Sequence, residues 1–140
     1  MTGYLLDTTV LIDWLRGDAA TVAWLQAKAE QGSRLVLSPV TVAEVLAGEP
    51  PNLRARRREE LSAYEFQPLT FETACLAGEL RYDQARAGKP VALPDLLQVA
   101  AARILGLDVA TSNPAHFPGV GVTNPREFMD RSSENLSDPS

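Results

Sequence analysis

The chain has 140 residues with one cysteine and one histidine, and its 13 Lys+Arg and 18 Asp+Glu give a formal net charge of −5. This length predicts a single domain, and the Cys and His counts exclude a disulfide framework, a zinc finger, an iron–sulfur site and a Cys–His protease dyad. The acidic balance excludes a general polyanion binder, so any binding of nucleic acid requires a local basic patch or a bound cation.

The first predicted elements are a short apolar strand and two helices. Residues 3–6 predict a buried strand, and a short helix that ends at Gly17 follows it. Asp18 can cap a longer helix over residues 19–31, because its carboxylate can accept hydrogen bonds from free backbone N–H groups. The side chains expected to face inward in that helix are Val22, Leu25 and Ala29.

The same alternation continues through the rest of the chain. Residues 34–37 predict a second strand, and Ser38 followed by Pro39 predicts a helix start that places Glu44 within the first two helical turns. The remaining predicted elements are a helix over residues 53–64, a strand over 66–69, a helix over 71–87, a helix from Pro94 to Gly106, a strand over 108–111 and a short strand over 121–123.

This order of elements predicts an α/β fold, a three-layer sandwich with a mainly parallel central sheet of four to five strands flanked by helices. We expect one domain over residues 1–127 and a polar, disordered tail over residues 128–140. The start of the chain lacks a signal peptide pattern, and no apolar run reaches the ~18 residues that span a bilayer. Together with the single cysteine, these features predict a cytoplasmic protein that does not associate with membranes.

Acidic residues are predicted at one edge of the sheet, where the working sites of parallel α/β folds lie. Asp7 ends the first strand, and Glu44 and Asp95 stand near helix starts that can reach the same edge. Three carboxylates within ~5 Å of one another would repel by roughly 3 kcal/mol per pair at an effective dielectric near 20. They would relieve this repulsion by taking up protons or by binding a divalent cation such as Mg²⁺ or Mn²⁺. A water bound to that cation is a potential nucleophile for hydrolysis of a phosphodiester.

Each acid also has a purely structural explanation. Asp7 could be only a helix N-cap, Asp95 could be only a partner of the helix dipole, and Glu44 could be a solvated helix residue. Residue spacing alone leaves this choice open.

Four segments in order resemble the motifs of PIN-domain ribonucleases, and most closely those of the VapC-type toxins of bacterial toxin–antitoxin pairs. The segments are LLDTTVLID at residues 5–13, SPVTVAEVLAG at 38–48, PDLLQVAAA at 94–102 and ATSNPAHF at 110–117. The resemblance covers roughly residues 3–125.

This resemblance implies an endoribonuclease that depends on Mg²⁺, with Mn²⁺ as a substitute, and hydrolyses RNA phosphodiester bonds through a metal-activated water. It assigns the metal-binding and catalytic roles to Asp7, Glu44 and Asp95. It also implies a homodimer that a cognate antitoxin neutralises, with DNA bound only indirectly through the antitoxin. Leu53, Leu61 and Tyr64 are apolar helical residues that could accept an amphipathic antitoxin segment.

The sequence departs from the family pattern in two respects. Many members carry a fourth acid at the place of Asn113 or at the place of His116, and this chain has neither acid. Asn113 can supply a carbonyl oxygen without a negative charge, so we expect weaker binding of any second cation. The second departure is Thr9, where the family often has Asn, although its hydroxyl can still hydrogen-bond Asp7. Thr111 and Ser112 are the other expected supporting residues.

Several further residues have a structural interpretation that is favoured over a functional one. His116 could act as an acid or base or be an ordinary loop histidine, and the ordinary role is favoured. Asp13 is expected to face solvent or pair with Arg16, and Cys75 is expected to be a small core residue. Trp14 and Trp24 are expected in the core or an interface.

The run of arginines over residues 54–58 stands out in an acidic protein. It could bind RNA phosphates, and the residues expected to do so are Arg54, Arg56, Arg57 and Lys89. Alternatively, the run is a solvated helix face paired with Glu59, Glu60 and Glu65. For the protein as a whole, the alternative to a nuclease is a catalytically weak PIN-like module that binds RNA or a partner protein without efficient cleavage.

Overall fold

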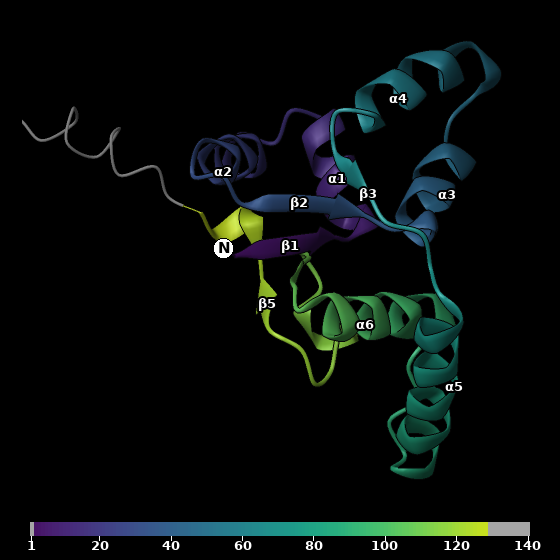
Figure 1. Cartoon of the computed structure of the whole chain (residues 1–140). Coiled ribbons are helices and arrows are strands. Elements are labelled where there is room, and N and C mark those ends of the chain that lie inside the picture. Colours follow the sequence, from purple (N-terminus) through teal and green to yellow (C-terminus); the bar gives the residue numbers. More distant parts are fainter. Residues whose placement is uncertain (1, 129–140) are drawn as a thin grey trace, which may run out of the picture.

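A five-stranded, all-parallel sheet forms the centre of the computed structural model, which describes residues 2–128 (Figure 1). Its strands are β1 (Gly3–Leu6), β2 (Arg34–Leu37), β3 (Glu65–Phe66), β4 (Asp108–Ala110) and β5 (Val122–Thr123). They lie in the order β3-β2-β1-β4-β5. The chain therefore moves outward in one direction from β1 to β3 and then returns to the other side of β1 with β4. The predicted fold class is confirmed.

Among the described residues, six α-helices connect and cover the strands. They are α1 (Thr8–Leu15), α2 (Ala19–Glu30), α3 (Pro39–Ala47), α4 (Arg54–Leu61), α5 (Phe71–Arg86) and α6 (Leu93–Leu105), with short 3₁₀ turns η1 (Pro51–Leu53), η2 (Pro114–His116) and η3 (Pro125–Glu127). Asp18, Ser38 and Thr70 each cap a helix by accepting a backbone N–H with the side chain. Gly106 ends α6 at φ +69°, a conformation that glycine adopts without strain.

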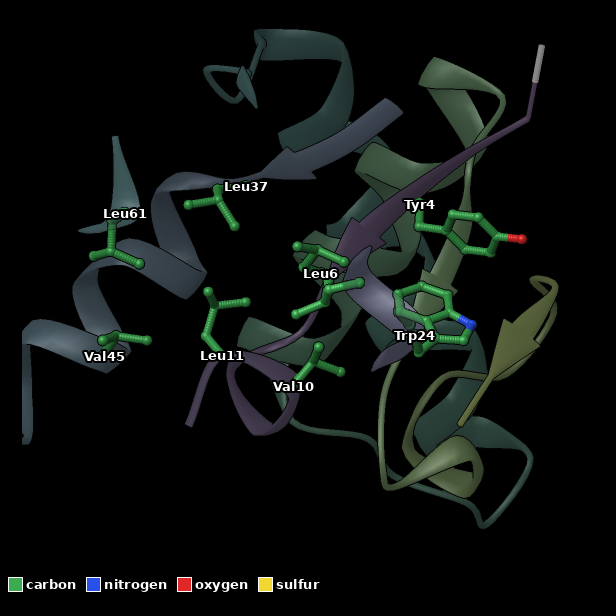
Figure 2. Close-up of a cluster of buried hydrophobic side chains, with 10 residues drawn as sticks. Tyr4, Leu6, Val10, Leu11, Trp24, Leu37, Val45 and Leu61 are labelled. Atoms are coloured by element: carbon green, nitrogen blue, oxygen red, sulfur yellow. The ribbon is translucent and has the colours of Figure 1, made fainter. Parts of the chain in front are cut away.

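Alternate residues of β1 point to opposite faces of the sheet and separate two hydrophobic clusters. Tyr4 and Leu6 face α1, α2 and α3, where they join a cluster that includes Val10, Trp24 and Val45 (Figure 2). Leu5 faces the other way, into a second cluster formed mainly with α6 and β4. The first cluster holds α1 and α3, and the second holds α6, so all three helices have fixed positions against the strand that precedes Asp7.

The third predicted strand is two residues long and starts one residue earlier than expected. β3 covers Glu65–Phe66, and its pairing ends when the N–H of Gln67 donates to Leu37 O at 3.0 Å. The next residue is Pro68, which has no N–H to continue the hydrogen-bond ladder. The prediction of a strand over residues 66–69 was therefore wrong beyond Phe66.

Single side chains that were expected in the core are exposed in two helices. In α2, Val22 is exposed and Ala29 is also exposed, whereas Thr21 and Trp24 are buried beside Leu25. In α5, the buried residues are Thr73 and Ala77, which places Cys75 about 200° around the helix from Thr73. Cys75 is consequently exposed, and its predicted place in the core was wrong.

Asp13 was expected at the surface, but its side chain is buried within α1 and pairs with Arg126 of η3. Arg126 Nε and Nη2 donate to the two carboxylate oxygens at 2.6 and 2.8 Å. The predicted partner, Arg16, does not pair with it. This bidentate contact fastens the last described turn of the chain to the first helix.

The predicted tail over residues 128–140 lies outside the described residues except for Phe128, which packs against the first hydrophobic cluster. Within the part of the chain that the structure describes, no helix is both long enough and apolar enough to cross a membrane.

Candidate active site

The candidate site lies beyond the carboxyl ends of β1 and β4, where the strand order reverses direction. Ligand sites in parallel α/β sheets occur at this type of switch point. Asp7 follows β1 directly, and its backbone N–H donates to Ala110 O of β4 at 2.9 Å. Thr111 follows β4, so both side chains are placed by adjacent strands at the same edge of the sheet.

The carboxylate of Asp7 is buried and accepts hydrogen bonds on both oxygens. Thr9 Oγ1 and Thr111 Oγ1 each donate to Oδ2 at 2.9 Å, and Gln98 Nε2 donates to Oδ1 at 3.1 Å. Asp7 is only 6% exposed, so these three donors replace hydration that the carboxylate loses on burial. The predicted contact from Thr9 is present, and the three bonds together hold the carboxylate in one orientation.

Glu44 and Asp95 approach Asp7 from two different helices, and each carries a raised pKa. Glu44 is exposed overall, and partial desolvation of its carboxyl is the main cause; the charges of Asp7 and Asp95 raise its pKa further, against an opposing effect of the Thr8 hydroxyl. Burial and the charge of Asp7 also raise the pKa of Asp95, and His116 opposes the shift. The three acids therefore act on one another electrostatically.

The donor set fits a hydrated divalent cation better than a fully enclosed one. Within residues 2–128, no three Asp, Glu, His or Cys side chains form a compact cluster ready to hold a metal. A Mg²⁺ ion, however, keeps several waters and takes only one or two carboxylates directly. The Thr8 hydroxyl is buried next to Asp7 in the chain; it lies near enough to Glu44 to lower the pKa of that carboxyl, but its geometry to any group among the described residues falls short of a full hydrogen bond. It leaves a polar atom at the site for water or substrate.

The segment after β4 wraps around Asp7 through its backbone. The N–H of Ser112 donates to Thr9 Oγ1 at 3.1 Å, and the N–H of Asn113 donates to Thr111 Oγ1 at 3.0 Å. The Asn113 side chain itself is exposed. His116 Nδ1 lies 3.5 Å from Asp95 Oδ2 with 61% of its side chain exposed, so this loop histidine stands beside one of the acids.

Two site residues were missed by the sequence analysis. Gln98 and Thr41 are fully buried, and Thr41 Oγ1 donates to Gln98 Oε1 at 3.0 Å and to Leu6 O at 2.8 Å. The available signal was a single polar residue, Gln98, inside the apolar run from Leu96 to Ala102. Such a residue must find a buried hydrogen-bond partner.

The arginines of α4 divide into paired and unpaired residues. Arg57 is mostly buried and pairs with Glu49 at 3.1 Å and Glu60 at 3.2 Å, and Arg56 pairs with Glu60 at 2.9 Å. Arg54 is exposed and makes no ion pair within the described part of the chain. Of the predicted acidic partners, Glu60 alone pairs with this run within residues 2–128; Glu65 pairs with Arg34 instead, and Glu59 makes no ion pair there.

Arg57 nevertheless shares a pocket with Glu44, one of the three site acids. A pocket of about 300 Å³ is lined by Glu44 and Arg57 together with Arg16, Glu49, Ile12 and Val45. Lys89, the remaining predicted phosphate contact, is exposed in the turn between α5 and α6.

The chain matches the PIN domain family over residues 4–121. Ribonuclease VapC10 of Mycobacterium tuberculosis is 35% identical over 118 residues, which cover 81% of this chain and 85% of that protein. Two solved structures are also similar. One is a toxin–antitoxin complex from Klebsiella pneumoniae (27% identity, TM-score 0.73, 87% of this chain and 97% of that chain), and the other is FitAcB from Neisseria gonorrhoeae (28% identity, TM-score 0.76, 89% and 99%).

Proposed function

Because the chain belongs to the PIN domain family, we propose that it is a metal-dependent endoribonuclease that acts in the cytoplasm as the toxin of a toxin–antitoxin pair. The observation that carries this proposal is the electrostatic coupling of two acids, Glu44 and Asp95, to the buried Asp7, whose charge helps to raise the pKa of each. Mutual repulsion of this kind is relieved when a cation binds.

We propose that Asp7, Glu44 and Asp95 would hold Mg²⁺, or Mn²⁺ as a substitute. When bound, such a cation supplies Lewis-acid chemistry, because it activates water and neutralises charge on a phosphate oxygen. Thr9 and Thr111 orient the Asp7 carboxylate with their hydroxyl donors. His116 holds its Nδ1 toward Asp95 with most of its side chain exposed, so the imidazole would be accessible to a substrate bound at these acids.

A matched pair of variants tests the proposal. Asp7→Asn removes the charge of the buried acid, and Asp83→Asn makes the same change at an exposed position of α5. We expect RNA cleavage in Mg²⁺ or Mn²⁺ to fall at least about 100-fold in Asp7→Asn, to remain in Asp83→Asn, and to stop with EDTA. Cleavage that persists in a folded Asp7→Asn protein would contradict the proposal.

An apolar groove formed by residues of α3, α4 and β3 supports the proposal of a protein partner. It has a volume of about 570 Å³ and is lined mainly by apolar side chains, including Leu61 and Tyr64 from the predicted antitoxin contact, together with Val42, Leu46 and Phe66. We propose that an amphipathic helix of the cognate antitoxin binds here, through apolar residues spaced along one helical face. Leu53 does not line this groove. We further propose that the toxin is a homodimer.

A further inference from the structure

We propose that Thr41 and Gln98 form a buried brace that positions Asp7 relative to Glu44 and Asp95, and thereby sets the affinity of the site for a divalent cation. This inference rests on the proposed function, because it assigns the brace to the same metal centre. Thr41 and Gln98 touch no substrate in this role and act through Asp7, so they are positioning residues.

The brace joins the three elements that carry the acids. Gln98 of α6 donates from Nε2 to Asp7 Oδ1 at 3.1 Å, and Thr41 of α3 donates to Gln98 Oε1 at 3.0 Å. Thr41 also donates to Leu6 O at 2.8 Å, in the residue that precedes Asp7. A hydroxyl has one proton, so Thr41 shares it between these two acceptors.

Each brace residue lies one helical turn from the acid on its own helix. Thr41 precedes Glu44 by three residues in α3, and Gln98 follows Asp95 by three residues in α6. Residues three apart lie on the same side of a helix. Any shift of α3 or α6 that separates the acids therefore also stretches a hydrogen bond of the brace.

Hydrogen-bond chemistry fixes the orientation of the Gln98 side-chain amide. The carboxylate of Asp7 can only accept, so Gln98 must turn its NH₂ group toward Asp7 and its carbonyl oxygen toward the Thr41 hydroxyl. Both residues are 0% exposed, so water cannot replace either partner. Loss of the Thr41 hydroxyl would leave the Gln98 carbonyl oxygen without its donor, and loss of the Gln98 amide would leave Oδ1 of Asp7 without its donor. In either case the Asp7 carboxylate would be held less firmly.

The experiment compares two fully buried threonines whose hydroxyl groups donate to different acceptors. Thr41→Val and Thr21→Val each remove a fully buried hydroxyl, and the Thr21 hydroxyl donates to the cap residue Asp18 at 2.7 Å. Gln98→Met removes the amide at nearly constant shape, and Thr41→Ser keeps the hydroxyl as a rescue. The readout is the Kd of the purified protein for Mn²⁺ alone, measured by calorimetry without RNA.

We expect Kd for Mn²⁺ to rise about 10-fold in Thr41→Val and in Gln98→Met, the low end of the range for residues that orient a metal ligand. Thr21→Val and Thr41→Ser should stay within about 2-fold of the wild type. The double variant Thr41→Val with Gln98→Met should lose little more than either single one, because both changes break the same network. Wild-type affinity in folded Thr41→Val and Gln98→Met would overturn the brace.

A measurement on the wild type keeps the proposal testable if the variants do not fold. The side-chain amide signal of Gln98 should shift as Mg²⁺ saturates the protein, whereas the amide of Gln26, exposed on α2, should not. An unmoved Gln98 signal at saturation would overturn the brace alone. Failure of the wild type to bind either cation would instead overturn the proposed metal centre, and the brace with it.

Discussion

At the scale of single residues, the site combines one carboxylate that hydrogen bonds hold in place with two carboxyl groups whose pKa values are raised. Asp7 is held by three donors, whereas Glu44 and Asp95 keep raised pKa values because of burial and the neighbouring carboxylates. Such an arrangement lowers the stability of the metal-free fold and favours cation binding. Function and stability therefore oppose each other at these positions.

Glu44→Gln should stabilise the metal-free protein at pH 7. A carboxyl whose pKa is raised on folding lowers stability when it is charged, and this penalty disappears as the pH falls through the folded-state pKa. We expect Tm in EDTA to rise by about 1–2 °C at pH 7, since solvent screens the exposed side chain, and the gain to shrink toward pH 4. A lower Tm for the variant at pH 7 would contradict this assignment.

Asn113→Asp should strengthen cation binding. The exposed side chain follows the Thr111 segment at the site and carries no charge, so an added carboxylate supplies the acid that many family members have. We expect tighter binding of Mn²⁺ and faster RNA cleavage in Mg²⁺. If both stayed unchanged, Asn113 would not be part of the metal centre.

At the scale of elements, the sequence predicted the helix ends and the central strand, because these depend on interactions between residues close in the chain. Ser38 caps α3, Gly106 ends α6, and the apolar run from Gly3 to Leu6 forms the central strand, because each depends on neighbouring residues only. The contact of Asp13 with Arg126 joins residues 113 positions apart, and that of Thr41 with Gln98 joins residues 57 apart. Such pairs depend on how elements pack, so residue spacing could not identify them.

Arg126→Met should destabilise the fold. The Asp13 side chain is 9% exposed, and loss of its bidentate partner leaves a buried charge uncompensated. We expect urea denaturation to give a loss of about 2 kcal/mol. Arg56→Met is the control, because it breaks an i,i+4 pair whose arginine is 72% exposed and should cost less than about 0.5 kcal/mol. Equal losses would show that η3 does not fasten α1.

Arg54→Glu should weaken RNA binding without loss of stability, because Arg54 is exposed and free of ion pairs within residues 2–128. We expect affinity to fall about 3-fold or more and the salt slope to fall by about 1. Arg103→Glu makes the same charge change roughly 12 Å along α6 from Asp95 and serves as the control, with its Tm measured because the change also removes the Nε hydrogen bond to Gly119 O. An equal effect of both variants would indicate a general charge effect rather than an RNA-binding face on α4.

At the scale of the whole molecule, one face of the sheet carries α1 to α4 and the other carries α6 with α5 outside it (Figure 1). This arrangement leaves apolar surface at the β3 edge, where Phe66 is 53% exposed. Phe128 packs against the first cluster, so removal of this residue would take an apolar contact away from that cluster.

Phe66→Asp should weaken binding of the cognate antitoxin about 10-fold or more, because it places a charge in the apolar groove. Phe71→Asp is the matched control, since Phe71 is 80% exposed at the start of α5 and does not line this groove. Both affinities can be measured by calorimetry with the purified antitoxin. Binding that weakens only in Phe71→Asp would place the antitoxin on α5 instead.

We propose that folding brings three acids that are distant in the sequence together to hold a divalent cation. The most direct measurement is the anomalous scattering of a crystal soaked in Mn²⁺, which locates the ion and its ligands together. We predict a peak coordinated by Asp7 and at least one of Glu44 and Asp95, directly or through water. A saturated crystal with no peak at these acids, or with Mn²⁺ bound only elsewhere, would contradict the proposed nuclease.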